Sequence, residues 1–139
     1  MEVTLPRLSV DQKKRLDEAV ARVSGFKKKG REGMPFQAHI VSKKPLLKGL
    51  YDVRGSAMLL DVYNMYMVRF EDLLIPWGPD LHVVLAADLS GKDGVDLGAL
   101  KSNQGFNNYG IAKGVETDRR RTVLIMSTQF NAVFAYAQL

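Results

Sequence analysis

The sequence predicts an all-β protein: an antiparallel β-sandwich with one N-terminal amphipathic helix. Two observations support this fold class. Apolar residues recur at helical spacing only before residue 24, and from Phe36 onward the apolar period changes to two. The later apolar segments are short, rich in β-branched and aromatic residues, and separated by turn-forming residues, as in sandwiches and barrels. Because no helical pattern lies between these segments, a parallel α/β fold is disfavoured.

The helix is expected over residues 10–23. Residues 9–12 (SVDQ) have the form of a capping box, in which the side chains of Ser9 and Gln12 each accept a hydrogen bond from the other's backbone N–H. The apolar positions that follow have helical spacing: Leu16, Ala19, Val20 and Val23. Ser24 and Gly25 supply the stop signal. Since the apolar stripe requires cover, the helix is expected to pack on the surface or edge of the sandwich.

Residues 27–35 (KKKGREGMP) lack an apolar period and contain two glycines and a proline. They are interpreted as a solvated basic linker, although a basic patch can also contact phosphates. The expected organisation is therefore an N-terminal helix and basic linker over residues 1–35, followed by a β-sandwich domain over residues 36–139.

Six strands are expected within the sandwich domain. They cover residues 36–42, 50–62, 65–73, 80–87, 121–127 and 130–137. The turn signals between them are Lys44-Pro45, Tyr63-Asn64, Trp77-Gly78-Pro79, Ser90-Gly91, Asp93-Gly94 and Gln104-Gly105.

Composition narrows the function classes. The chain has 139 residues, 46% of them hydrophobic and 25% charged, as expected for one soluble globular domain. No apolar run approaches the ~20 residues that span a bilayer, and the first twenty residues lack the apolar core of a signal peptide. The absence of cysteine excludes disulfides, thiolate metal sites and cysteine nucleophiles. With a formal charge of only +5, we expect no nucleic-acid partner. Because no long apolar run is present, we expect no membrane insertion by this segment.

Asp80 and His82 form the first candidate site. A strand can begin just after Pro79, and alternation then places both side chains on one face of it. The carboxylate would orient the imidazole as a base or metal ligand, or else both side chains are simply solvated. Because the chain has no Ser-His-Asp order, HExxH motif, P-loop or GxGxxG motif, no catalytic activity is expected.

The other histidine and the methionines are interpreted as structural residues without a role in a site. His39 is expected to be a surface or hydrogen-bonded histidine. Met65 and Met67 share a strand face, and thioethers suit Cu(I), yet methionine more commonly fills cores. No metal or cofactor is therefore expected.

The stretch SNQGFNNYGI (102–111) contains four amides, two glycines and two aromatic residues. It is interpreted as a loop in which Phe106 or Tyr109 supplies a flat face and the amides supply hydrogen bonds to a polar ligand. Together with the 77–82 turn it predicts one ligand-binding patch, made of Trp77, Asp80, His82, Asn107, Asn108 and Tyr109. In the competing interpretation the two aromatic residues, Trp77 and Tyr109, are buried and the Asn side chains close their own turns.

Several short motifs occur in an order that resembles the DM-thirteen (electron transfer DM-thirteen) domain family. They are RGSAMLL (54–60), VRFEDL (68–73), GPDLHVVL (78–85), VDLGALKSNQGFNNYGI (95–111) and TVLIMSTQFNAVFAYAQL (122–139). The resemblance covers about residues 48–139 and leaves the helix and the basic linker outside it.

The resemblance implies a β-sandwich in which residues 78–80 form the turn that launches a central strand. Family members are usually secreted or tethered at the cell surface, often beside DOMON or cytochrome b-type domains, and an electron-transfer role is proposed for them. That role depends on a cysteine in the closing motif, which aligns with Ser127 here. Serine neither exchanges disulfides nor serves as a soft ligand. We expect Ser127 beside core residues with its hydroxyl hydrogen-bonded.

Taken together, these features predict a non-catalytic, extracytoplasmic binding or adhesion module that meets an unknown ligand or protein partner at the cell surface. A cytoplasmic location stays open. Two alternatives remain. One is an electron-transfer accessory domain, and the other is an enzyme that uses Asp80 and His82.

Overall fold

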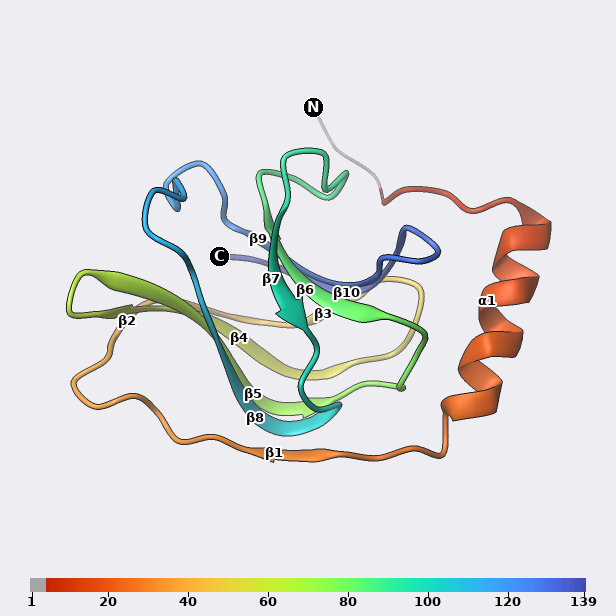
Figure 1. The fold of residues 1–139 in the computed structure, drawn as a ribbon, viewed down its shortest axis with the longest axis horizontal. Helices are drawn as coiled ribbons and strands as arrows, with labels where there is room; N and C mark the ends of the chain where they lie inside the picture. Colours follow the sequence, from red (N-terminus) through yellow and green to blue (C-terminus); the bar gives the residue numbers. More distant parts are fainter. Residues whose placement is uncertain (1–4) are drawn as a thin grey trace.

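The computed structural model describes residues 5–139 as two five-stranded sheets that pack face to face, with one helix beside them (Figure 1). All strand pairs are antiparallel except β1 with β8. The predicted fold class, an antiparallel β-sandwich with an N-terminal helix, is confirmed.

The helix α1 spans Val10–Val23. Sheet A has the strand order β1-β8-β5-β4-β2, with β1 Lys29–Arg31, β8 Gln104–Gly110, β5 Met65–Leu74, β4 Arg54–Val62 and β2 His39–Pro45. Sheet B has the order β3-β10-β9-β6-β7, with β3 Leu47–Lys48, β10 Ala132–Gln138, β9 Thr122–Ser127, β6 Leu81–Ala86 and β7 Val95–Ala99.

The helix begins and ends where the sequence predicts, and its capping box is formed. The Ser9 N–H donates to Gln12 Oε1 at 2.9 Å, and the Gln12 N–H donates to Ser9 Oγ at 3.1 Å. Leu16 and Val20 are buried within the main core, and the Tyr51 hydroxyl donates to the Asp17 carboxylate at 2.6 Å. The helix therefore covers one side of the sandwich, as expected (Figure 1).

The main core lies between the inner faces of the two sheets. Alternate residues of β6 point into it: Leu81, Val83 and Leu85. In this core they pack with the sheets' largest fully buried side chains, which are Phe70 of β5 and Phe134 of β10. A smaller apolar cluster, including Val84, Leu124 and Met126, covers the outer face of sheet B.

The segment after the helix is mostly exposed, as its composition suggests, but part of it is a strand and not a loop. Lys29–Arg31 form β1, which pairs in parallel with β8 (Figure 1). A Cβ at Gly30 would lie 2.5 Å from the Phe106 carbonyl oxygen, so only glycine permits this close approach. Because β1 lies inside the expected linker and belongs to the same sheet as β2, this part of the linker is a piece of the sandwich.

The strand predictions are right for most of the chain and wrong at several places. Lys44-Pro45, expected as a turn, is the end of β2, residues 50–53 precede β4 instead of forming its start, and β3 was not expected. The 102–111 segment is mostly strand β8, so Gln104-Gly105 is not a turn, and β7 was not expected. Residues 36–38 precede β2 instead of forming its start. The Tyr63-Asn64 turn is confirmed: both residues have positive φ, at 52° and 64°, as a two-residue hairpin requires.

Candidate functional site

Asp80 and His82 come together, as predicted, but as part of a larger cluster on the outer face of sheet B. His82 Nε2 lies 3.2 Å from Asp80 Oδ1, and His82 Nδ1 lies 2.8 Å from Asp96 Oδ2. The Thr128 hydroxyl donates to the second oxygen of Asp80. Asp96 belongs to β7 and Thr128 follows β9, so only the register of sheet B brings them to the pair.

The two carboxylates favour the protonated imidazole. The hydrogen bond with Asp96 raises the pKa of His82 above its ordinary value, partial burial opposes the rise, and Asp80 adds to it. The hydrogen bond from Thr128 lowers the pKa of Asp80, and His82 contributes further. Both ring nitrogens are thus engaged by carboxylate oxygens, which leaves neither of them available as a base.

This arrangement predicts a pH-dependent stability. A raised folded-state pKa means that the imidazolium stabilises the fold fully below its unfolded-state pKa of about 6.5, and that this stabilisation is lost as the pH rises through the folded-state value. The free energy of unfolding of the wild type should therefore fall more steeply between about pH 6 and about pH 8 than that of His82→Gln, measured by urea unfolding. His39→Gln, the control, should keep the wild-type slope. Equal slopes for wild type and His82→Gln would contradict the assignment.

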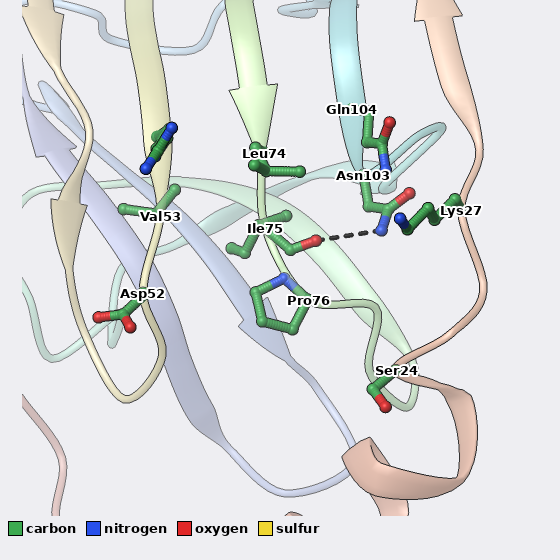
Figure 2. A pocket seen from close by; sticks show the side chains of 10 residues that line it. Ser24, Lys27, Asp52, Val53, Leu74, Ile75, Pro76, Asn103 and Gln104 are labelled. Carbon is green, nitrogen blue, oxygen red and sulfur yellow. Dashed lines mark hydrogen bonds between the residues drawn. The ribbon is translucent and has the colours of Figure 1, made fainter.

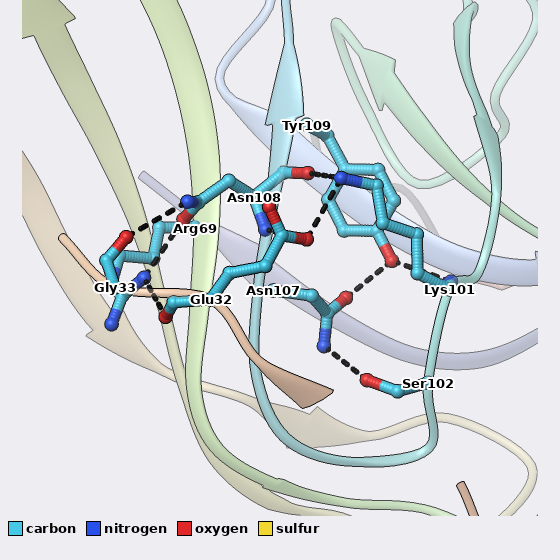
Figure 3. A network of polar contacts seen from close by, with 8 residues as sticks. All are labelled: Glu32, Gly33, Arg69, Lys101, Ser102, Asn107, Asn108 and Tyr109. Atoms are coloured by element: carbon cyan, nitrogen blue, oxygen red, sulfur yellow. Dashed lines mark hydrogen bonds and ion pairs between the residues drawn. The ribbon is translucent and has the colours of Figure 1, made fainter. Parts of the chain in front are cut away.

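The amides of β8 are buried and hydrogen-bonded inside the protein (Figure 3). Asn108 Oδ1 accepts from Arg69 Nη1 at 2.9 Å, and Asn108 Nδ2 donates to the Gly33 carbonyl at 3.1 Å. Asn107 Nδ2 donates to Ser102 Oγ at 2.8 Å, while its Oδ1 accepts from the Tyr109 hydroxyl. Because β8 lies between β1 and β5, these amides complete a packed sheet and leave no open loop.

The same network attaches residues 32–33, which follow β1, to the other strands of sheet A (Figure 3). The Glu32 carboxylate accepts from Lys101 Nζ at 2.9 Å and from the Asn108 N–H at 3.3 Å, and Arg69 Nη1 donates to the Glu32 carbonyl at 2.9 Å. Partial burial raises the pKa of Glu32, but the hydrogen bonds from Lys101 and Asn108 outweigh burial and hold this pKa below its usual range. Arg69 also donates to Glu71 at 3.0 Å.

The expected single patch is not formed. Trp77 is half-buried and packs against Phe26 with the rings tilted by 53° and their centroids 5.4 Å apart, while Tyr109 is buried. Within residues 5–139, no side-chain hydrogen bond or ion pair joins the 77–82 turn to residues 107–109. Both Asn side chains are buried: Asn108 bonds Arg69 and Gly33 of other segments, whereas Asn107 bonds Ser102 and Tyr109 within its own segment. Ligand binding by these residues stays a prediction, but 107–109 present no exposed face for it.

The structural interpretations of His39 and of the methionines have different outcomes. His39 is exposed on β2, the edge strand of sheet A. Met65 is 51% exposed and Met67 is half-buried, so the core interpretation is wrong for Met65, which lies beside the hairpin turn. Among residues 5–139, no three His, Cys, Asp or Glu side chains form a group suited to a metal ion.

Ser127 has the environment that the sequence predicts. It is fully buried at the end of β9, its hydroxyl donates to the Pro79 carbonyl at 2.7 Å, and its oxygen accepts from the Phe130 N–H at 3.3 Å. The side chain therefore links the turn that launches β6 to the turn that follows β9.

Substitutions at Ser127 should separate its packing from its hydrogen bonds. Ser127→Ala leaves the Pro79 carbonyl and the Phe130 N–H without their partner and is expected to cost about 1–2 kcal/mol of unfolding free energy. Ser127→Cys keeps a weak donor of similar size and should cost less. Urea unfolding measures both values, and a larger loss for the cysteine variant would show that the site does not accommodate sulfur.

A cleft of about 550 Å³ opens at the end of sheet A (Figure 2). Its floor is apolar and consists of Val53, Leu74, Ile75 and Pro76. Its polar rim consists of Ser24, Lys27, Asp52, Arg54, Asn103 and Gln104. The lining comes from four segments: the end of α1, the start of β4, the end of β5 and the start of β8. Sequence reasoning missed it because no one segment carries a recognisable part of it.

Asn103 forms one wall of the cleft and fixes its shape. Its Nδ2 donates to the Ile75 carbonyl at 3.1 Å (Figure 2). Its Oδ1 accepts from the Lys28 N–H at 2.8 Å. The segment after α1 is thereby tied to the end of β5. Because this amide is buried and hydrogen-bonded on both sides, the walls of the cleft are formed without a ligand.

Fold and site together define a two-sheet β-sandwich with a preformed cleft and a buried polar network. The model of the electron transfer DM13 family matches residues 47–139, more than half of the chain, and the protein belongs to that family. The resemblance seen in the sequence is confirmed. Comparison with curated proteins found no match, and neither did comparison with solved structures. Within residues 5–139, no helix has the length and apolarity that a bilayer crossing requires.

The family description implies a redox group, and the side chains of the cleft, of Ser127 and of the His82 cluster do not fit one. Haem iron and copper take imidazole, thiolate or thioether ligands, and none of these lines the cleft. The hydroxyl of Ser127 is occupied by the Pro79 carbonyl, and both nitrogens of His82 face carboxylates. We therefore derive no electron-transfer step from these side chains.

Proposed function

We propose that this DM13 domain is a non-catalytic binding module, presented outside the cytoplasm, whose ligand occupies the cleft at the end of sheet A. One observation carries the proposal: the cleft combines an apolar floor with a polar rim, and its volume of about 550 Å³ suits a small molecule. Small-molecule sites typically have about 300–1,000 Å³ and this division between apolar walls and a few polar groups.

The cluster around His82 supports the non-catalytic part of the proposal. General base catalysis requires an imidazole nitrogen within reach of a substrate proton. Here Asp80 and Asp96 hold both nitrogens, and Thr128, the neighbouring hydroxyl, contacts Asp80 and not the imidazole. This cluster instead joins β6 to β7 and to the turn after β9.

An uncharged fluorescent dye, N-phenylnaphthylamine, tests whether the cleft binds apolar bodies. We expect saturable binding to the wild type. Leu74→Gln should abolish it, whereas Leu47→Gln should not, because both leucines are 45% exposed at strand ends but only Leu74 lines the cleft. Circular dichroism checks that both variants fold. Absence of saturable binding, or equal binding by the two variants, would contradict the proposal.

The extracytoplasmic location is proposed because members of this family are usually secreted or tethered at the cell surface. An impermeant amine-reactive label applied to intact cells tests it, because the exposed lysines of this domain should be modified before the cells are lysed. Modification only after lysis would place the domain in the cytoplasm.

Electron transfer is the second candidate, because the family description names it. Visible absorption, metal analysis and voltammetry of the purified protein decide between the two. We expect no haem Soret band, no stoichiometric copper and no reversible redox wave. Any one of these signals would favour the electron-transfer role.

A further inference from the structure

Two cations line the cleft, and neither is neutralised by the protein. Lys27 follows α1 and Arg54 begins β4, so they reach the cleft from different sides of the floor. Within residues 5–139, neither side chain has an ion-pair or hydrogen-bond partner. Arg69, by contrast, is buried and bonded to Glu71, Asn108 and the Glu32 carbonyl.

The carboxylate at the rim does not cancel these charges. Asp52 is exposed and pairs with Lys48, at 3.3 Å, outside the cleft lining. The lining therefore carries two positive charges against one negative charge that has another partner. A small anion entering the cleft meets a positive rim and replaces no existing ion pair.

The floor between the cations is apolar and only partly covered. Leu74 is half exposed, and Ile75 and Pro76 continue the apolar surface beside it (Figure 2). No aromatic side chain lines the cleft, so the stacking face that sugars commonly use is missing. An apolar ligand body would bury this surface at roughly 25 cal/mol per Å².

We propose that the cleft binds small anionic amphipaths, with a carboxylate or sulfonate between Lys27 and Arg54 and an apolar body over Leu74. This ligand class rests on the proposed function of the cleft. Gln104 lies on the same rim and its amide supplies a further hydrogen-bond donor to the anion, whereas the Ser24 hydroxyl already donates to the Ala21 carbonyl at 3.2 Å. The amide of Asn103 is already occupied and serves only to shape the wall.

Displacement of N-phenylnaphthylamine by two competitors with the same alkyl chain tests the proposal. Decanoate should displace the dye from the wild type at a concentration at least about tenfold lower than decanol, which corresponds to about 1.4 kcal/mol for the charge. Decanol is the more apolar of the two, so a preference for decanoate cannot arise from the alkyl chain. The preference should weaken as the salt concentration rises.

Variants assign the preference to the two cations. Arg54→Gln and Lys27→Gln should each reduce the preference for decanoate to a few-fold. The preference is the ratio of the two displacing concentrations in one variant, so any change in dye affinity cancels from it. Arg119→Gln and Lys113→Gln, which remove one charge elsewhere on the surface, should keep it.

Each outcome decides one of the two proposals. Dye binding with equal displacement by decanoate and decanol overturns the ligand class alone, as does a preference that survives in both cleft variants. No dye binding at all overturns the proposed function and the ligand class with it.

Discussion

Leu16→Ala is expected to lower the free energy of unfolding by about 3 kcal/mol, because the leucine lies in the main core and its truncation leaves a cavity. Leu16 is 0% exposed although it belongs to a helix outside the region matched by the family model. The helix, the sheets and Tyr51 pack together, so the variant should unfold in a single transition at a lower urea concentration. Circular dichroism of the helix and fluorescence of Trp77 should report the same midpoint.

Val10→Ala is the matched control on the same helix. Val10 is 89% exposed, so its truncation should change the free energy of unfolding by no more than about 0.5 kcal/mol. A loss below about 1 kcal/mol for Leu16→Ala, or helix unfolding that precedes loss of the sheets, would show that α1 is an appendage and not part of the domain.

Arg69→Met should cost about 3 kcal/mol or more. Arg69 is 4% exposed, and its removal leaves the Asn108 amide oxygen and the Glu32 carbonyl without their donor and the Glu71 carboxylate with Lys43 alone. Removing one partner of a buried charged network costs about 3–5 kcal/mol, because the remaining polar groups stay desolvated. Methionine keeps much of the side-chain volume, so the loss reports the hydrogen bonds more than a cavity.

A second readout locates the effect. Because Arg69 binds the Glu32 carbonyl and orients Asn108, which holds Gly33, the amides of β1 should exchange with solvent faster in the variant. Arg119→Met is the control: Arg119 makes only an exposed pair with Glu116, worth about 0–1 kcal/mol. Equal losses for the two variants would contradict a structural role for the network.

The candidate site was predictable only where its parts lie close in the sequence. Asp80 and His82 are only two residues apart, so the pair forms locally, although Asp80 lies in the turn before β6, with φ of 52°, and not on the strand. Asp96 and Thr128 join them through the pairing of β6 with β7 and β9. The cleft depends on contacts among four segments, and residues such as Leu74 and Arg54 carry no sequence signal of it.

The sequence by itself determined the helix, the tight hairpin and most strands of the sandwich. The reason is that a capping box, a Tyr63-Asn64 turn and a period of two act within a few residues. Only the tertiary structure decided that β1 and β8 are strands, because Gly30 and the Asn108 amide are satisfied by partners far away along the chain. Polar residues resemble a solvated loop until such partners bury them, and those partners are set by sheet pairing rather than by local sequence.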